Sequence, residues 1–532
     1  MWILGVLGLM SVVLAYATTL STGIGWDSGI DTHAAIEMRS LMPGMTLTQA
    51  YESIYSTSEF YGILIQSAAD GLSQLGGGSG FLSPAELHTY RLQGIVTTTL
   101  MLLAVIASAA VTGIVLASRL AAMFVWATGL SIPLVMGLTA LDFKDAPVAA
   151  GLVLVSSGIA LAAAGPTVWR AWAPACAMVA IGTFVTLGVR VGAWPLVGAL
   201  LVASLLVLGI GAVLKRAWTR VLQLGGVAAG GVLAGLIGLI LLNPLARIDL
   251  PRWVYDAYLT SSSFPWEGTV RTMGQDLDAT NLPWWYAPAW FGAQLPIVGS
   301  VAAMAGLVFW ARLLLRQREQ PIGTPLALTP FVAQALLLPT AIVLSGAVLY
   351  DGVRHLLFVV PALVVVMASG MAWADHQPEG QAVWPRNLVA AALLLVPVAS
   401  LIADLRWFPY QYAHLNILAS DHDGSRDWEV DYWGVSVVEA ADRLRDLGID
   451  EIRVMPEIDP KGTAEVVEIT LATEDLDRKG SSFGTYAFAR SEARLPDDCQ
   501  EVFTIERAGV VLGAAGLCVE TVVVNDAGTT VE

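Results

Sequence analysis

Long apolar segments alternate with short polar segments from the start of the chain to about residue 403. The first apolar segment covers residues 2–20, which is about the length that a helix needs to cross a bilayer. A sliding apolar window finds further segments at about 92–117, 120–140, 147–166, 174–190, 195–213, 222–243, 288–311, 328–349, 355–373 and 387–403. The pattern predicts an α-helical polytopic membrane protein with about 11 transmembrane helices.

Composition supports the same class. The 532 residues have a mean hydropathy of +0.66 and only 14% are charged, whereas charged residues make up about 25% of soluble domains. The net charge is −16, and the acidic residues concentrate in the first polar segment and after about residue 420. Lys and Arg are scarce and lie mostly between apolar segments, so the chain lacks the basic surface that nucleic-acid binding requires.

The basic residues predict which connections face the cytoplasm. One alternate set of connections contains Arg119, Arg170, Lys215, Arg216, Arg220, Arg312, Arg316, Arg318 and Arg386, and the positive-inside rule makes this set cytoplasmic. The other set faces outward: the first loop (21–91), 141–147, a turn near Arg190, an aromatic loop (244–287), 350–355 and the tail. The first apolar segment has no basic region before it and no clear cleavage site after it. We therefore expect a retained helix in a cytoplasmic (inner) membrane.

The first outward loop carries its own helical pattern. Between residues 45 and 69, apolar side chains recur at roughly helical spacing: Leu47, Tyr51, Ile54, Tyr55, Phe60, Tyr61, Leu64 and Ile65. This spacing predicts helices that lie along the membrane surface. The glycine-rich residues 76–80 predict a flexible break. They are not a phosphate-binding loop, because no strand precedes them and no Lys-Ser/Thr pair follows.

The second long outward loop, 244–287, is rich in aromatic residues and prolines. One interpretation is an interfacial aromatic belt, in which Trp and Tyr are expected at the headgroup level. The other is a platform beside a lipid-linked or sugar substrate, since aromatic faces pack against apolar ring faces. For the second interpretation we select Trp284, Trp285 and Tyr286, together with Tyr350 of a later outward turn.

The tail differs from the rest of the chain because it is polar and acidic. Residues 435–447 predict an amphipathic helix that ends at Gly448, and 452–455, 485–490 and 502–505 predict strands. The chain therefore divides into a transmembrane domain (1–414) and a small extracytoplasmic α/β domain (415–532). Cys499 and Cys518 either form a disulfide in an oxidising compartment or remain two thiols, and the sequence leaves both open.

Three charged clusters stand where apolar segments end, all on the predicted outward side. They are Gly25-Trp26-Asp27-Ser28-Gly29-Ile30-Asp31-Thr32-His33, Asp142-Phe143-Lys144-Asp145-Ala146-Pro147 and Tyr350-Asp351-Gly352-Val353-Arg354-His355. Charges so close to hydrocarbon are costly, so they indicate a functional site. Few charged residues fall near the middle of the apolar segments, which argues against a transporter.

With the sequences 282–288 (Leu-Pro-Trp-Trp-Tyr-Ala-Pro), 408–412 (Phe-Pro-Tyr-Gln-Tyr) and 431–434 (Asp-Tyr-Trp-Gly), these clusters resemble the GT-C glycosyltransferases. The resemblance is to the dolichyl-phosphate-mannose–protein mannosyltransferase class and its bacterial relatives, and it covers residues 20–416. It implies inverting transfer of a sugar from a polyprenyl-phosphate donor to an acceptor at the outer membrane face. The family's first-loop motif is usually Asp-Glu, whereas this chain has Asp31-Thr32, and Glu37 or Asp27 are candidates to replace the missing Glu.

The resemblance assigns roles to the charged residues. Inverting transfer needs a carboxylate that takes the acceptor's proton, and Asp31 is the candidate base. Asp145 is expected to orient a substrate, although a carboxylate at that position also suits the capping of a helix. His33 lies near Asp31, but a lone Asp–His pair is weak evidence for a metal, so neither a metal nor another cofactor is predicted.

The leaving phosphate needs positive hydrogen-bond donors. Four residues are candidates for this role: Lys144, Arg190, Arg354 and His355. Each has a structural alternative: Lys144 can extend to the interface, Arg190 can form an ion pair, and Arg354 can pair with Asp351. The alternative function is a non-catalytic subunit with the same scaffold in a larger membrane complex. Neither the sugar nor the acceptor follows from the sequence.

Overall fold

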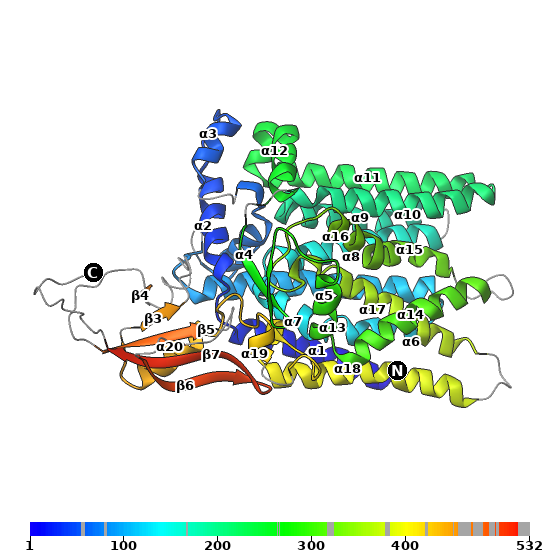
Figure 1. Ribbon diagram of the computed structural model, residues 1–532. Coiled ribbons are helices and arrows are strands. Elements are labelled where there is room, and N and C mark those ends of the chain that lie inside the picture. The colour runs from blue at the N-terminus through cyan, green and yellow to red at the C-terminus, as the bar shows by residue number, and fades with distance from the viewer. Residues whose placement is uncertain are drawn as a thin grey trace, which may run out of the picture.

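The computed structural model describes all residues except 55–58, 79–81, 166–168, 263, 265, 317–323, 378–382, 421–423, 451, 456–469, 472–481, 489–494, 496–498 and 520–532. Long helices lie side by side in one bundle, and the C-terminal strands lie beyond one end of it, at the left of Figure 1. The chain is therefore mostly helical with a small sheet region near its C-terminus, as the apolar pattern and the polar tail predict.

Nine helical segments of the described chain are long and apolar enough to cross a membrane. They are α1 (Trp2–Ser21), α5 (Leu87–Val115), α8 (Asp145–Ala164), α9 (Trp169–Val189), α10 (Trp194–Leu214), α11 (Trp218–Leu242), α14 (Ile297–Arg316), the segment Pro325–Leu344 and α18 (Val383–Trp407). The pair α6 (Arg119–Thr128) and α7 (Pro133–Leu141), bent by 55°, makes a tenth. The protein is thus a multi-pass membrane protein.

The remaining differences from the expected spans have local causes. The expected span 355–373 is α17 (Val359–Asp375), a shorter apolar helix. The expected span 288–311 is divided into α13 (Tyr286–Gln294) and α14, with Pro296 between them, because proline breaks a helix. The segment Pro325–Leu344 comprises the 3-10 turn η3 (Pro325–Leu328), α15 (Thr329–Val332), a π-helical turn η4 (Ala333–Leu337) and α16 (Leu338–Leu344).

The helices alternate in direction, so connections gather at two ends. At one end, Ser118 Oγ donates to Asp375 Oδ2 at 2.8 Å, and the backbone N–H of Thr324 donates to Val115 O at 2.7 Å. The connections at this end border the basic residues on which the topology prediction rests. The opposite end carries all three charged clusters, as their ion pairs show below.

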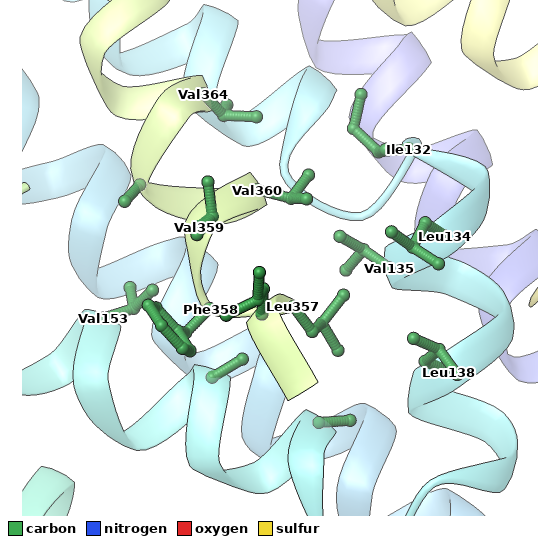
Figure 2. Close-up of a cluster of buried hydrophobic side chains, with 14 of the residues drawn as sticks. Ile132, Leu134, Val135, Leu138, Val153, Leu357, Phe358, Val359, Val360 and Val364 are labelled. Carbon is green, nitrogen blue, oxygen red and sulfur yellow. The ribbon is translucent and has the colours of Figure 1, made fainter. Parts of the chain in front are cut away.

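A buried apolar cluster supports the charged end from beneath. Figure 2 shows Leu357 and Val360 beside Ile132, Val135 and Leu138 of the α6–α7 region, while Phe358 points away from them toward Val153. Leu138 lies four residues before Asp142, and Leu357 lies three residues after Arg354. Burial of these side chains therefore fixes two of the charged segments relative to each other.

Shorter elements cover the charged end of the bundle. The first loop contributes α2 (Trp26–Ser40), α3 (Leu47–Glu52) and α4 (Leu64–Leu75), of which α2 and α3 stand across the ends of the long helices in Figure 1. The expected surface helices in 45–69 correspond to α3 and the start of α4, while Tyr55, Ser79 and Gly80 lie outside the described residues. The aromatic loop 244–287 is regular: it forms α12 (Pro244–Ser262) and a hairpin of β1 (Thr269–Thr272) and β2 (Gln275–Asp278).

The C-terminal region contains the short helices α19 (Gly424–Asp427) and α20 (Val437–Asp446) and a five-stranded sheet in the order β4-β3-β5-β7-β6. The strands are β3 (Ile452–Met455), β4 (Thr470–Leu471), β5 (Ser482–Phe488), β6 (Cys499–Arg507) and β7 (Val510–Val519). The predicted helix and three predicted strands correspond to α20, β3, β5 and β6, whereas the sequence analysis missed β4 and β7. Cys499 and Cys518 are opposite each other on β6 and β7 and form a disulfide.

Candidate functional site

Helix α2 presents two carboxylates on one face. Asp27 and Asp31 are four residues apart, which places them one helical turn apart on the same side. Lys144 Nζ lies 3.0 Å from Asp31 Oδ1 and 3.3 Å from Asp27 Oδ2, so one ammonium group joins both. The sequence analysis did not predict this helix. The signal for it was the i,i+4 spacing of the two aspartates.

The connection between α7 and α8 carries two further aspartates, Asp142 and Asp145, which have different roles. Asp142 Oδ1 accepts hydrogen bonds from the backbone N–H groups of Lys144 and Asp145, each at 2.8 Å. Asp142 therefore performs the helix-capping role that the sequence analysis offered as an alternative for Asp145. The Asp145 carboxylate is instead paired with two arginines: Arg190, and Arg354 at 3.2 Å.

Arg354 is the centre of the cluster. Besides Asp145, its guanidinium pairs with Asp351 at 3.0 Å and reaches Asp27 at 4.0 Å, while only 2% of the residue is exposed. The guanidinium carbon also lies 4.8 Å from the Tyr350 ring and 5.2 Å from the Trp433 ring, within cation–π range. The two alternatives for Arg354, a partner for Asp351 and a member of a functional cluster, thus hold together.

The turn that carries Arg354 has a defined backbone. Asp351 and Gly352 have φ values of 55° and 67°, a left-handed conformation that glycine adopts without strain. The hydroxyl of Tyr286 donates to Gly352 O at 2.9 Å and holds this turn against α13. The short 3-10 helix η5 (Arg354–Leu356) follows and leads into α17.

Tyr61 joins the remaining cations. Its ring lies 4.3 Å from Lys144 Nζ and 5.7 Å from the Arg190 guanidinium carbon. Tyr61 forms an isolated β-bridge with Arg190, next to which Gly62 approaches the backbone of Gly188 so closely that a side chain at residue 62 would clash. The sequence analysis treated Tyr61 only as one apolar position among several. No local signal marks it, because its partners come from distant segments.

Burial and neighbouring charges set the pKa values in the cluster. Burial raises the pKa of Asp31 to about 6, against the opposing attraction of Lys144. Burial and the neighbouring Asp145 raise the pKa of Asp142 to about 7. Burial would lower the pKa of Lys144, but Asp27 and Asp31 outweigh it and raise that pKa well above its usual value. The pKa of His355 is lowered well below 6.5 by burial and by the charge of Arg354, so this imidazole is neutral at pH 7.

Three hollows border the cluster. The first, here called the acidic hollow, has about 210 Å³ of empty space and is lined by Gly25, Asp27, Ser28, Asp31, Leu141, Asp142, Phe143, Lys144 and Trp433. The second, the basic hollow, has about 410 Å³ and is lined by Phe60, Tyr61, Arg190, Thr260, Ser261, Phe264, Val348, Tyr350 and His355. A third, of about 260 Å³, shares Asp31 and Lys144 with the acidic hollow and Tyr61 with the basic hollow.

The structure thus brings seven of the ten predicted site residues together: Asp31, Lys144, Asp145, Arg190, Tyr350, Arg354 and His355. The other three do not join them. Trp284 is 76% exposed, and neither it nor Trp285 lines one of the three hollows at the cluster. Tyr286 is buried and lines a separate hollow with Leu282 and Val343.

The aromatic rings at the cluster therefore differ from the expected platform at 284–286. They belong to Tyr61, Tyr350, Trp433 and Trp266, which stacks on Tyr350 with ring centroids 4.4 Å apart. Local sequence did not separate these rings from the others, because all of them follow the ends of apolar segments. Within the described residues, no three His, Cys, Asp or Glu side chains gather in a way that could hold a metal ion.

Comparisons with known proteins agree with this architecture. No protein-family model matches the chain, and no curated protein matches it by sequence. Among solved structures, ArnT from Cupriavidus metallidurans bound to undecaprenyl phosphate superposes with a TM-score of 0.50 at 11% sequence identity, covering 97% of this chain and 98% of ArnT. The Archaeoglobus fulgidus oligosaccharyltransferase with a tethered acceptor peptide gives a TM-score of 0.46 at 11% identity, covering 87% of this chain.

The two likenesses have different weight. This chain spans 63% of the length of the oligosaccharyltransferase, and we draw no argument from that weaker match. The ArnT match extends over nearly the whole of both chains and shows the fold. The chain therefore has the GT-C fold of ArnT, which confirms the fold that the resemblance implied.

Proposed function

We propose that the protein is a membrane glycosyltransferase that moves a sugar, with inversion, from a polyprenyl-phosphate donor to an acceptor at the outer membrane face. The observation that carries this proposal is the continuous charge cluster at one end of a GT-C fold. It runs from Asp31 through Lys144 and Asp27 to Arg354, Asp145 and Arg190, with hollows on either side. A purely structural subunit has no need for unfilled space beside its most buried charges, so the hollows favour the enzyme.

Asp31 is the proposed general base. It lines the acidic hollow, and a carboxyl group whose pKa is about 6 is ionised at neutral pH yet basic enough to accept a proton in the transition state. In an inverting transfer, the acceptor oxygen attacks the anomeric carbon from the face opposite the phosphate. The acceptor then lies on the Asp31 side of the sugar and the leaving phosphate on the other side.

The basic hollow is the proposed site of the donor phosphate. Arg190 and His355 line it, and Arg354 stands behind them in contact with Tyr350. A guanidinium group stabilises the charge that develops on a leaving phosphate. Neutral His355 adds a hydrogen-bond donor, and Lys144 stands between the acidic hollow and Tyr61. The undecaprenyl phosphate bound to ArnT, whose fold this chain shares, supports a lipid-phosphate donor.

The positive-inside rule supports the orientation that the proposal requires. The basic connections of the sequence lie at the end opposite the cluster. We therefore propose that the cluster and a C-terminal domain of residues 415–532 lie outside an inner membrane, with a membrane domain of residues 1–414. Donor and acceptor would then meet outside the cytoplasm.

The test is transfer activity in proteoliposomes supplied with radiolabelled polyprenyl-phosphate sugars. We expect the wild type to release the sugar from its lipid phosphate and Asp31→Asn to lose this activity while inserting and folding normally. Glu52→Gln is the control: Glu52 lies on α3 of the same loop, is exposed and lines none of the three hollows, so this variant should stay active. Full activity of Asp31→Asn would exclude the base assignment, and a wild type that cleaves no lipid-phosphate sugar would exclude the function.

A further inference from the structure

Building on the proposed function, we propose that the acidic hollow is the acceptor subsite, that it accepts an uncharged hydroxyl group, and that Trp433 orients this hydroxyl. Three independent features of the structure lead to this assignment: the charges that line the two main hollows, a buried indole N–H without a hydrogen-bond partner among the described residues, and the contacts that fix Trp433 within the segment after α18.

The two main hollows carry opposite charge. Three acidic side chains line the acidic hollow, those of Asp27, Asp31 and Asp142, against the single ammonium of Lys144. Asp142, whose pKa is about 7, is partly ionised at neutral pH. The basic hollow is lined by Arg190 and His355, and no acidic side chain is among its described lining residues. Since like charges a few ångströms apart repel strongly where water is scarce, an anionic acceptor is disfavoured in the acidic hollow. The charges therefore favour the donor phosphate in the basic hollow and an uncharged acceptor in the acidic hollow.

Trp433 supplies a donor in the acidic hollow. The residue lines this hollow and is only 5% exposed, and its indole N–H is buried with no hydrogen-bond partner among the described residues. Buried N–H groups are normally satisfied, so this one marks a position where a ligand oxygen can accept. Its ring lies 5.2 Å from the guanidinium carbon of Arg354, and it is also next to Gly25.

These groups together select a hydroxyl. Asp31 accepts a hydrogen bond and Trp433 donates one, so the ligand atom must both donate and accept. A hydroxyl does both, an ammonium only donates, and a phosphate dianion only accepts. In the transfer, the hydroxyl oxygen forms the bond to the anomeric carbon and its proton passes to Asp31. The bond from the anomeric carbon to the phosphate oxygen breaks, and its electron pair leaves with the phosphate.

The segment after α18 positions Trp433. Asp431 accepts hydrogen bonds from the backbone N–H groups of Val435 and Ser436 at 2.9 and 3.2 Å, and from the hydroxyls of Tyr412 and Ser436. The Tyr412 ring stacks on Trp433 with centroids 6.1 Å apart. The C-terminal region therefore completes a site whose other walls come from α2 and the α7–α8 connection.

The test compares two acceptor probes that differ in charge, octyl β-glucoside and octyl β-glucuronide, and measures release of the donor sugar to water separately. We expect the wild type to use the glucoside and to discriminate against the glucuronide by tenfold or more in kcat/KM. Trp433→Phe keeps a ring beside Arg354 and removes only the N–H. It should raise the KM for the glucoside about three- to tenfold, the effect of one neutral hydrogen bond, with little change in donor hydrolysis. Trp218→Phe, at an exposed tryptophan at the start of α11 and outside the three hollows, is the control and should match the wild type.

Each other outcome is decisive. Three results would overturn the inference. The wild type could use both probes equally well, it could use neither probe while still hydrolysing the donor, or Trp433→Phe could leave the KM for the glucoside unchanged. If Trp433→Phe lost donor hydrolysis as well, Trp433 would act on folding or on the donor and not on the acceptor. No donor cleavage by the wild type would instead refute the proposed function, and the inference would fall with it.

Discussion

Arg354 Nη1 lies 3.2 Å from Asp145 Oδ2, although 209 residues separate the two along the chain. Both side chains are almost fully buried, at 2% and 4% exposure. The pair joins the start of α8 to the turn before α17, and through Arg190 and Asp27 it extends to α9 and α2. One ion pair therefore connects the four segments from which the proposed active site is built.

Removing Arg354 should destabilise the protein as well as inactivate it. Arg354→Ala leaves Asp145 and Asp351 as buried carboxylates with one cation fewer, which costs about 3–5 kcal/mol. The control is Arg252→Ala, because Arg252 is half-exposed in its pair with Asp256 and its loss should cost less than about 1 kcal/mol. Denaturant unfolding in detergent measures both. Equal, small losses would show that the Arg354 pairs contribute little to stability.

Transfer activity should depend on pH through Asp31. The base must be ionised, and its pKa is raised to about 6, so activity is at its full level above pH 7 and falls about tenfold per unit well below pH 6. The measurement is kcat/KM as a function of pH, which reports the pKa of the free enzyme, with circular dichroism at each pH as the control for folding. A profile that stays flat down to pH 4.5 in a folded protein would contradict the role of Asp31.

The cap at Asp142 should be replaceable by asparagine but not by alanine. Asp142 accepts two backbone N–H bonds at the start of α8, and loss of such a cap costs about 0.5–2 kcal/mol. Asp142→Ala should therefore unfold at lower denaturant concentration, whereas Asp142→Asn keeps an accepting oxygen and most of the stability. Identical midpoints for the two variants would show that the side-chain oxygen does not cap α8.

Tyr61 should act through its ring and not through its hydroxyl. The ring face lies against Lys144 and Arg190, and a cation–π contact contributes about 0.5–2 kcal/mol. Tyr61→Phe should keep the donor KM within about twofold, while Tyr61→Ala should raise it roughly threefold to thirtyfold. The donor KM in proteoliposomes measures this. A loss in Tyr61→Phe equal to that in Tyr61→Ala would assign the effect to the hydroxyl.

Much of the architecture is readable from local patterns. Apolar segments of bilayer length gave the membrane class and the approximate spans, because hydrocarbon requires each crossing segment to satisfy its own backbone. Helical periodicity and the turn residue Gly448 predicted the helix α20, and the strand pattern predicted β3 with its observed bounds, Ile452 and Met455. The grouping of the charged clusters at one end follows from alternating helix direction alone.

The partners within the cluster do not follow from local patterns. Sequence offered Asp145 as a helix cap, whereas packing gives the cap to Asp142 and pairs Asp145 with two arginines. Of the four rings that it selected, Tyr350 contacts Arg354, but the rings at 284–286 do not reach the cations, whereas Tyr61 and Trp433 do. The physical reason is the range of the forces involved. Hydropathy patterns and helix periodicity are set by residues that are close together in the chain. Each ion pair and ring contact instead depends on how distant helices pack, because that packing determines where the side chains lie.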